Sequence, residues 1–179
     1  MDIVDLAAQP LEIRTQAASV LADAFPDENG WPTIELGLAE IKWIAKDGFV
    51  RAALEQQQVL GWVGGLPEYR GRVWELHPIV VAKERRLHGI GRVLVAAFES
   101  EARRRGGLTA TLGTDDHYGQ TSVFDADLYR DLPGHISGLR DLGRRHPFLF
   151  YRKLGYVVTG LMPDANGRGR PDIYMSKAL

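Results

Sequence analysis

The stretch "ERRLHGIGRVLVAAFESEARRRGG", residues 84–107, joins a turn that contains two glycines to an amphipathic helical pattern. Apolar residues recur at helical spacing after the turn, at Ile90, Leu94, Ala97 and Phe98. The helix is therefore predicted to begin between Gly89 and Gly91, with its polar side chains facing away from the core. Glycine at this place lets the chain turn tightly and leaves the backbone amides uncovered by side chains.

This turn is chemically suited to bind phosphate. The N–H groups of a first helical turn have no intrahelical partner, and the helix dipole adds partial positive charge there. Cationic side chains around the turn favour a polyphosphate over a neutral ligand; they are Lys83, Arg85, Arg86 and Arg92. A surface loop with solvated arginines explains the same residues, so both interpretations stay open on this stretch alone. A P-loop and a dinucleotide fingerprint are poorer matches, because the former's Gly-Lys-Ser/Thr and the latter's third glycine are missing.

The composition is that of a globular protein. The 179 residues are 45% hydrophobic and 25% charged, which predicts a single domain over residues 1–179. No window approaches the roughly 18 uninterrupted apolar residues of a membrane span, and the N-terminus lacks a basic region followed by an apolar run. The formal net charge of −1 gives no general attraction to nucleic acid. We therefore expect a cytoplasmic protein with neither a membrane nor a nucleic-acid partner.

Cysteine is absent from the chain. This excludes disulfides, thiolate nucleophiles and cysteine metal sites. Any covalent mechanism must therefore use another residue.

The order of helical and strand patterns predicts an α+β fold, that is, a mixed α/β arrangement of helices around one central, mostly antiparallel sheet. Helices are predicted over 11–25, from near Pro32 through "TIELGLAEIKWIAK", after Gly89, and in "HPFLFYRKLGY" up to Gly155. Strands are predicted over 2–6, 49–55, 58–69, 72–82 and 107–114, and in "YVVTGLM" and "DIYMSKAL". The segment "PDENG" (26–30) is expected to break the chain, and 115–146 is expected to be irregular.

The strand "RVWELHPIVV" carries two polar side chains within an apolar pattern. Period-two alternation puts Glu75 and His77 on one face. The other members of that face are Val73, Ile79 and Val81. A carboxylate and an imidazole in such a strand are costly unless they are paired or used. Pro78 cannot donate to a neighbouring strand, so the sheet is expected to be interrupted beside it. An interruption, an acidic group and a downstream phosphate turn together indicate a cleft.

With these features the chain resembles the GNAT superfamily of acyl-coenzyme A-dependent N-acetyltransferases. The segment "RRLHGIG" (85–91) matches its Arg/Gln-x-x-Gly-x-Gly/Ala pyrophosphate turn through Arg86, Gly89 and Gly91. More specific are the segments "WELHPIVV", "RGGLTATLGTDD", "HPFLFYRKLGY", "MPDANG" and "PDIYMSK". They resemble the aminoglycoside 6'-N-acetyltransferases, in particular the dimeric branch of enterococci and soil bacteria. The resemblance covers roughly residues 58–178.

The resemblance implies a GNAT-type fold whose sheet splays to bind acyl-CoA. It also implies a homodimeric enzyme of antibiotic resistance, which moves acetyl from acetyl-CoA to the 6'-amine of an aminoglycoside by direct attack in a ternary complex. By resemblance, the pantetheine arm pairs with the backbone of Ile79, Val80 and Val81. The pyrophosphate is held by Arg86 and by the amides of His88, Gly89, Ile90, Gly91 and Arg92.

The same resemblance assigns the chemical roles. Glu75 matches the general base, Tyr151 matches the group that protonates the departing thiolate, and His77 lies beside the acceptor. Glu75 alone is a poor base, because an alkylammonium has a pKa of about 10 and unperturbed Glu titrates at about 4.3. Burial or a water chain is needed to help it. An aromatic residue such as Tyr151 in this pattern is also compatible with a place in the core.

A polycationic acceptor requires acidic contacts. Asp115 and Asp116 directly follow a strand, where ligand groups are often displayed, although "TDD" can also cap the next helix. Asp172 in the terminal hairpin and Glu75 are further candidates. The segment "ELH" lacks a third ligand at suitable spacing, so no metal is expected. The cations of "RRR" (103–105) are expected to be solvated at a helix C-terminus.

Two rival functions stay open at this point. The same chemistry can act on another amine, such as a polyamine, a peptide N-terminus or a lysine. A non-catalytic acyl-CoA-binding sensor is a rival of another class, and the presence of both Glu75 and Tyr151 speaks against it.

Overall fold

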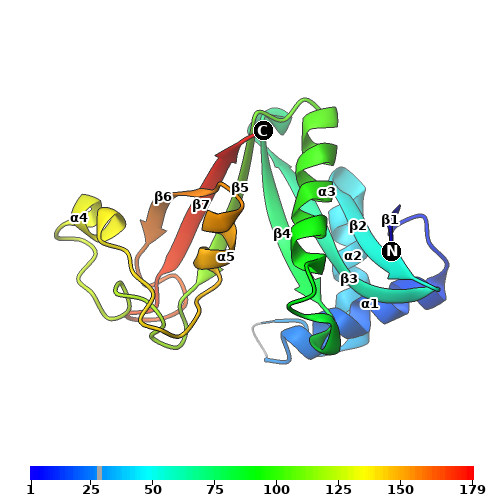
Figure 1. The fold of residues 1–179 in the computed structure, drawn as a ribbon, viewed down its shortest axis with the longest axis horizontal. Helices are drawn as coiled ribbons and strands as arrows, with labels where there is room; N and C mark the ends of the chain where they lie inside the picture. Colours follow the sequence, from blue (N-terminus) through cyan, green and yellow to red (C-terminus); the bar gives the residue numbers. More distant parts are fainter. Residues whose placement is uncertain (28–29) are drawn as a thin grey trace. The chain divides into compact units, whose positions relative to one another are not determined.

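The computed structural model describes residues 1–27 and 30–179, which form two compact units (Figure 1). The first unit comprises Met1–Ala110 with Leu179, and the second comprises Thr111–Ala178. The expectation of one domain over the whole chain is not tested by this division and stays a prediction.

The first unit is built from strands that pair in sequence and from helices that cover them. In chain order its elements are β1 (Asp2–Asp5), α1 (Leu11–Ala24), α2 (Ile34–Asp47), β2 (Phe49–Glu55), β3 (Gln58–Glu68), β4 (Val73–Val81) and α3 (Ile90–Arg104). The strands β1 to β4 form successive antiparallel pairs. Each element lies close to its predicted range, because its apolar periodicity runs over its whole length.

The second helix begins after Pro32 and does not include it. Thr33 is the N-cap residue, and its Oγ1 accepts a hydrogen bond from the Leu36 amide at 3.3 Å. The helix predicted to start near Pro32 thus begins two residues later, at Ile34, because the threonine cap sets the start of the helix. The break predicted at "PDENG" includes Glu28 and Asn29, which lie outside the described residues.

One face of this sheet is covered by α1 and α2. Buried apolar side chains from both helices and from the strands form one cluster there, which includes Ile13, Leu21, Ile41, Ile44, Trp62 and Val80. Trp62 is fully buried, and its Nε1 donates to the carbonyl oxygen of Ala17 on α1 at 2.9 Å. The indole therefore fills the core without leaving its N–H group unsatisfied.

The other face is covered by α3, which runs along β4 in Figure 1. Leu94 and Phe98 of α3 are fully buried. The Phe98 ring packs against Phe49 at 5.7 Å between centroids, and Phe49 packs against Trp74 at 5.2 Å. This apolar seam fixes α3 on the sheet and so determines where the N-terminus of the helix lies.

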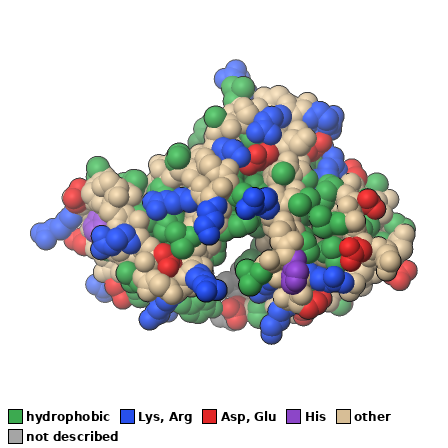
Figure 2. All heavy atoms as spheres, in the orientation of Figure 1, with side chains coloured by type: hydrophobic (Ala, Val, Ile, Leu, Met, Phe, Trp, Pro, Cys, Tyr) green, Lys and Arg blue, Asp and Glu red, His purple; other side chains and the backbone are tan. Residues whose placement is uncertain are grey.

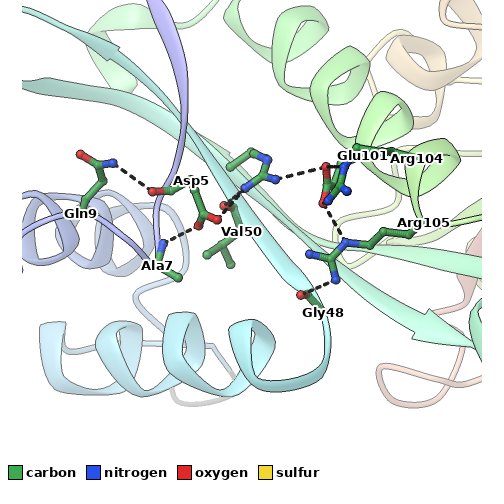
Figure 3. A network of polar contacts seen from close by, with 9 residues as sticks. Asp5, Ala7, Gln9, Gly48, Val50, Glu101, Arg104 and Arg105 are labelled. Carbon is green, nitrogen blue, oxygen red and sulfur yellow. Dashed lines mark hydrogen bonds and ion pairs between the residues drawn. The ribbon is translucent and has the colours of Figure 1, made fainter.

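A charged network ties the C-terminal end of α3 to β2 and β1 (Figure 3). The Glu101 carboxylate accepts hydrogen bonds from Nε of Arg104 at 2.8 Å and from Nε of Arg105 at 2.7 Å. It also forms an ion pair with Arg51 of β2 at 3.2 Å, although only 7% of the Glu101 side chain is exposed. Arg51 in turn pairs with Asp5 of β1 at 3.1 Å. A buried carboxylate is thus matched by three guanidinium groups.

The arginines of "RRR" are more than solvated cations. Arg105 donates to the carbonyl oxygen of Gly48 at 3.0 Å. Its guanidinium also lies over the rings of Phe49 and Trp74, at 5.2 and 5.5 Å from their centroids. The expectation of a purely solvated run is therefore wrong for this residue, because the tertiary fold brings aromatic rings and a free carbonyl beneath it.

The second unit contains the remaining strands and two short helices. The chain enters it through β5 (Thr109–Asp115) and continues with α4 (Leu132–Ser137), α5 (Phe148–Lys153), β6 (Val157–Met162) and β7 (Asp172–Ala178). The last two strands pair in antiparallel register, and Thr111 Oγ1 of β5 donates to the carbonyl oxygen of Met175 on β7 at 3.3 Å. The helix α4 lies within the stretch predicted to be irregular, because a helix of six residues is too short to show a helical periodicity in the sequence.

The strands follow the order β1-β2-β3-β4-β5-β7-β6. The predicted fold class is thereby confirmed as a mixed α/β fold with a seven-stranded, mostly antiparallel sheet. Over residues 1–27 and 30–179, no helix has both the length and the apolar character that a membrane crossing requires.

The Glu101 network generates a prediction about stability. Contacts with Arg104, Arg105 and Arg51 outweigh burial and lower the pKa of Glu101 from 4.5 to about 2. We expect Glu101→Gln to reduce the free energy of unfolding by about 2–3 kcal/mol at neutral pH, since each pKa unit is worth about 1.4 kcal/mol. The pKa is depressed in the folded state, so this stabilisation is present above pH 4.5 and disappears as the pH falls towards 2.

Urea unfolding at neutral pH and at about pH 3 measures the effect. The difference between wild type and variant should shrink at the lower pH. The exposed carboxylate of Glu84 supplies the control, because Glu84→Gln removes the same charge from the surface. An equal loss for both variants would contradict the role of the network.

Candidate functional site

The strand β4 contains one residue more than the opposing part of β3. Before the proline, Leu76 pairs with Gly65. After it, Ile79 pairs with Val63. Two residues of β4 therefore lie opposite one residue of β3, which defines a β-bulge. The interruption predicted beside Pro78 is confirmed.

The residue of β3 opposite the bulge must be glycine. A Cβ at Gly64 would collide with the carbonyl oxygen of His77 and would lie 2.9 Å from Cδ1 of Ile44 on α2. Close approach of the two backbones leaves no room for a side chain. Gly64 therefore permits the bulge, and the bulge positions His77.

The bulge also reverses the alternation of side chains along β4. Val80 packs in the cluster covered by α1 and α2. A Cβ on Gly61, directly opposite Val81, would lie 3.2 Å from Cδ1 of Leu94 on α3. Val81 thus faces α3, whereas His77 faces α2. The predicted shared face of residues 73 to 81 is therefore wrong, because one added residue shifts the period of two by half a repeat.

Glu75 and His77 stay on one face, and α2 supplies a partner for the histidine. Glu40 of α2 lies with its Oε1 at 3.3 Å from His77 Nε2. The other oxygen of Glu40 accepts a hydrogen bond from Trp31 Nε1 at 3.1 Å. The Trp31 ring meets the His77 ring edge to face, at 5.7 Å between centroids. Two carboxylates, an imidazole and an indole thus form one acidic site around the bulge.

The ionisation of this site follows from burial and from its charges. Burial raises the pKa of Glu75, the charge of His77 opposes the rise, and Glu68 adds to it. The contact with Glu40 raises the pKa of His77 against the effect of burial, and the charge of Glu75 adds to the rise. Burial alone would raise the pKa of Glu40, but His77 and Trp31 outweigh it, so that pKa lies below its ordinary value. The site therefore favours a Glu40 carboxylate beside a His77 imidazolium.

The turn before α3 has the geometry predicted for a phosphate site. Gly89 is the N-cap residue with φ 83°, and nothing lies within 4 Å of the place of a Cβ there. The amide of Val93 makes the first helical hydrogen bond, to Gly89 O at 3.2 Å. The amides of Ile90, Gly91 and Arg92 precede it and lie in the first turn, where helical amides have no partner along the helix.

Lys83, Arg85 and Arg86 precede α3 in the sequence, and Figure 2 shows Lys and Arg side chains interspersed with Asp and Glu side chains on this face of the molecule. Arg86 does not lie free: its Nε donates to the carbonyl oxygen of Val81, at 3.2 Å. His88 Nδ1 contacts the carbonyl oxygen of Arg86 at 2.7 Å. Arg85 pairs with Glu55 at 3.7 Å. The Arg86 contact joins the turn to the end of β4, and the Arg85 contact joins the preceding segment to β2.

In the second unit, Asp115 and Asp116, which are both predicted to contact the acceptor, differ in burial. Asp115 is exposed at the end of β5, where Asn166 Nδ2 donates to its Oδ1 at 2.8 Å. Asp116 is fully buried, and its carboxylate accepts bonds from the amides of Gln120 and Thr121 and from Thr121 Oγ1, each at 2.8 Å. The expectation that Asp116 contacts a ligand is therefore corrected, because its oxygens hold the following loop.

The remaining predicted residues also lie in the second unit. Asp172 begins β7, beside Gly113 of β5, where a Cβ would collide with the carboxylate. Tyr151 of α5 is 7% exposed, and its ring packs edge to face against Phe150 and Tyr156. Burial raises the pKa of the Tyr151 phenol, so the hydroxyl keeps its proton over the physiological range. Both functional roles stay predictions.

His146 shows how burial can give a histidine a structural role. It is 1% exposed, its Nδ1 accepts from the Phe148 amide at 3.2 Å, and its Nε2 lies 2.9 Å from Asp115 O. Nε2 therefore carries the proton of a neutral ring. Burial lowers the pKa of His146, which favours that neutral form.

No cluster of three His, Asp or Glu side chains suited to a metal ion occurs in the part of the chain that the structure describes. The expected lack of a metal stays a prediction.

Sequence reasoning missed Glu40 and Trp31. Both lie in 26–48, the segment for which the resemblance offers no counterpart. Glu40 follows a pattern of solvent-facing charges on a helix, and only its contact with a strand 37 residues downstream distinguishes it. A tryptophan beside a proline at the start of a helix was the available signal, and it is weak.

The fold and the site define a class of enzyme, the acyl-CoA-dependent acetyltransferases. Residues 15–124 match the model of the acetyltransferase (GNAT) family, and the chain belongs to this family. No curated protein sequence matches the chain.

The chain is similar over nearly its whole length to solved aminoglycoside 6'-N-acetyltransferases. One of them, in complex with coenzyme A, is 36% identical with a TM-score of 0.91, and the match covers 99% of this chain and 97% of that one. The enzyme from Enterococcus faecium is 35% identical with a TM-score of 0.88, over the same shares of the two chains. An aminoglycoside 6'-acetyltransferase of type Ii is 31% identical, with a TM-score of 0.76 and the same coverage. The resemblance predicted from the sequence is thereby confirmed.

Proposed function

We propose that this protein transfers an acetyl group from acetyl-CoA to the 6'-amino group of aminoglycoside antibiotics, by direct attack in a ternary complex. The observation that carries the proposal is the likeness over 99% of the chain to a solved aminoglycoside 6'-N-acetyltransferase that holds coenzyme A. The acidic site around the β4 bulge supports it, because an aminoglycoside is a polycation. Cytoplasmic location, homodimer formation and a role in resistance belong to the same proposal.

The turn before α3 supplies the binding site for the co-substrate. Its first-turn amides and the positive end of the helix dipole favour a pyrophosphate. The open space at Gly89 fits this role, since nothing lies within 4 Å of a Cβ there. The backbone of Ile79, Val80 and Val81 adjoins the turn through Arg86 and would pair with the pantetheine arm. Acetyl-CoA itself supplies an activated acetyl group as a thioester.

Glu75 is the residue proposed to receive the proton of the attacking amine. The ammonium form has a pKa of about 10, so the amine must lose a proton before it can attack. Burial raises the pKa of Glu75 and makes the carboxylate a stronger base than an exposed Glu. The proton leaves to Glu75 directly or through a water. Tyr151, protonated through burial, would donate to the departing thiolate.

Acidic side chains would hold the other ammonium groups of the acceptor. Glu75 and Glu40 lie at the bulge, together with His77. Asp115 is exposed in the second unit and stays a candidate, as does Asp172. Asp116 is left out because its carboxylate is buried and occupied.

Two aminoglycosides that differ at the 6' position test the regiochemistry. Neomycin carries a 6'-amine, and paromomycin carries a hydroxyl there. We expect release of coenzyme A thiol with acetyl-CoA and neomycin but not with paromomycin, because an alcohol is not acetylated at this site. Equal turnover would show that another amine is modified. Absence of turnover with both drugs would favour a different amine substrate or a non-catalytic sensor.

Glu75→Gln tests the proton acceptor. Glutamine keeps the shape of the side chain but cannot take the proton, so kcat should fall about 10- to 1,000-fold. The control is Glu12→Gln, which removes an exposed carboxylate of α1 away from the site and should leave kcat unchanged. An unchanged rate for Glu75→Gln, measured by thiol release, would remove Glu75 from the mechanism.

Gly89→Asp tests the phosphate turn. The variant places a negative charge among the first-turn amides, so acetyl-CoA binding should weaken about tenfold or more, which corresponds to about 1.4 kcal/mol. Gly71 gives a matched control, since it also has positive φ and open space around the place of its Cβ. Gly71→Asp should leave the dissociation constant unchanged in titration calorimetry. An unaltered constant for Gly89→Asp would refute the assignment.

A further inference from the structure

The acidic site has a second layer, which α2 supplies. Glu40 lies on α2, far in the sequence from Glu75 and Tyr151, yet its carboxylate lies 3.3 Å from His77 and 3.1 Å from Trp31. Only 16% of the Glu40 side chain is exposed. The carboxylate therefore cannot be explained as a solvated charge on a helix surface.

The two oxygens of Glu40 are satisfied in different ways. Trp31 donates a hydrogen bond to Oε2. Oε1 is buried from solvent and accepts no aligned hydrogen bond from any residue of 1–27 or 30–179, so its neighbour is the His77 ring at 3.3 Å. Burying a carboxylate oxygen beside a neutral ring would be costly. The arrangement is favourable when His77 carries its proton.

The contact also orients the imidazole. Glu40 contacts Nε2 of His77. The Trp31 ring packs edge to face against the imidazole, with 65° between the two ring planes, and so restrains the orientation of the imidazole. Nδ1 is therefore the nitrogen that remains for the acceptor side. Glu40 and Trp31 together fix which edge of His77 the site presents.

His77 acts in turn on Glu75. The two residues are neighbours on one face of β4, two positions apart in the sequence, which corresponds to about 7 Å along the strand. A positive charge at that distance favours the ionised form of Glu75 and opposes burial and the charge of Glu68. The titratable groups that face this pair are Glu40 from α2 and Glu68 from β3.

We propose that Glu40 is a positioning residue of the acceptor site, which holds the His77 imidazolium on the face of β4 that carries Glu75. Through His77 it favours the ionised form of Glu75, which is the form that accepts a proton. This inference rests on the proposed acetyl transfer, which it extends to a residue of α2. Glu40 acts on the acceptor side alone and takes no part in holding acetyl-CoA.

A double-mutant cycle tests whether Glu40 acts through His77. We expect Glu40→Gln to lower kcat/KM for the acceptor about tenfold at neutral pH, which is about 1.4 kcal/mol. In a His77→Gln background the same substitution should cost no further activity, because the residue through which it acts is gone. KM for acetyl-CoA should stay unchanged throughout.

The matched control is Glu35→Gln, which removes a carboxylate from an exposed position of the same helix. It should leave kcat/KM unchanged in both backgrounds. An equal loss for Glu40→Gln with and without His77 would overturn the inference, as would no loss in the wild-type background. The cycle is measured with whichever amine the wild type acetylates.

NMR titration of the His77 ring gives a readout that needs no turnover. In Glu40→Gln the pKa of His77 should fall by about one pH unit or more, since its carboxylate partner is replaced by a neutral amide. An unshifted titration would overturn the inference even if aminoglycosides are acetylated. A downward shift in a protein that acetylates no aminoglycoside would refute the proposed function and leave the Glu40–His77 coupling standing.

Discussion

The added residue at His77 and Pro78 in β4 is the constraint on which the site depends. Proline removes one donor from the strand, and the glycine of β3 opposite it leaves room for the backbone to bulge. In the N-terminal part of β4, up to the bulge, the side chains of Glu75 and His77 face α2. After the bulge, Val81 faces α3 and Val80 faces the core formed with α1 and α2. One strand thereby serves an acidic site on one face and adjoins the phosphate turn on the other.

The two ends of α3 have complementary roles. At its C-terminal end, Glu101 gathers Arg51, Arg104 and Arg105, and the guanidinium of Arg105 covers Phe49. These contacts and the buried aromatic seam fix the helix on the sheet. At the N-terminal end, the first-turn amides are left for a ligand. Rigid anchoring of one end is what lets the other end hold a charged group in a defined place.

The sequence predicted which residues form the site better than it predicted where their side chains lie. Glu75, His77 and the glycine turn could be found from their types and spacing, because polar groups in an apolar strand and a glycine before a helix are local signals. Glu40 and Trp31 could not, since a glutamate on an amphipathic helix looks like any exposed charge. Asp116 failed in the opposite sense: it follows a strand like Asp115, but its carboxylate turns inward to bind Gln120 and Thr121.

Except for the short helix α4, the sequence by itself determined the order of helices and strands, and it also determined the absence of cysteine chemistry and the family. These properties depend on periodicity, composition and local motifs, which each short stretch carries alone. Only the tertiary structure decided which face each residue of β4 occupies, which arginine of "RRR" is anchored, and which carboxylate holds His77. Those outcomes depend on a single inserted residue and on contacts between segments distant in the chain, and no local pattern records them.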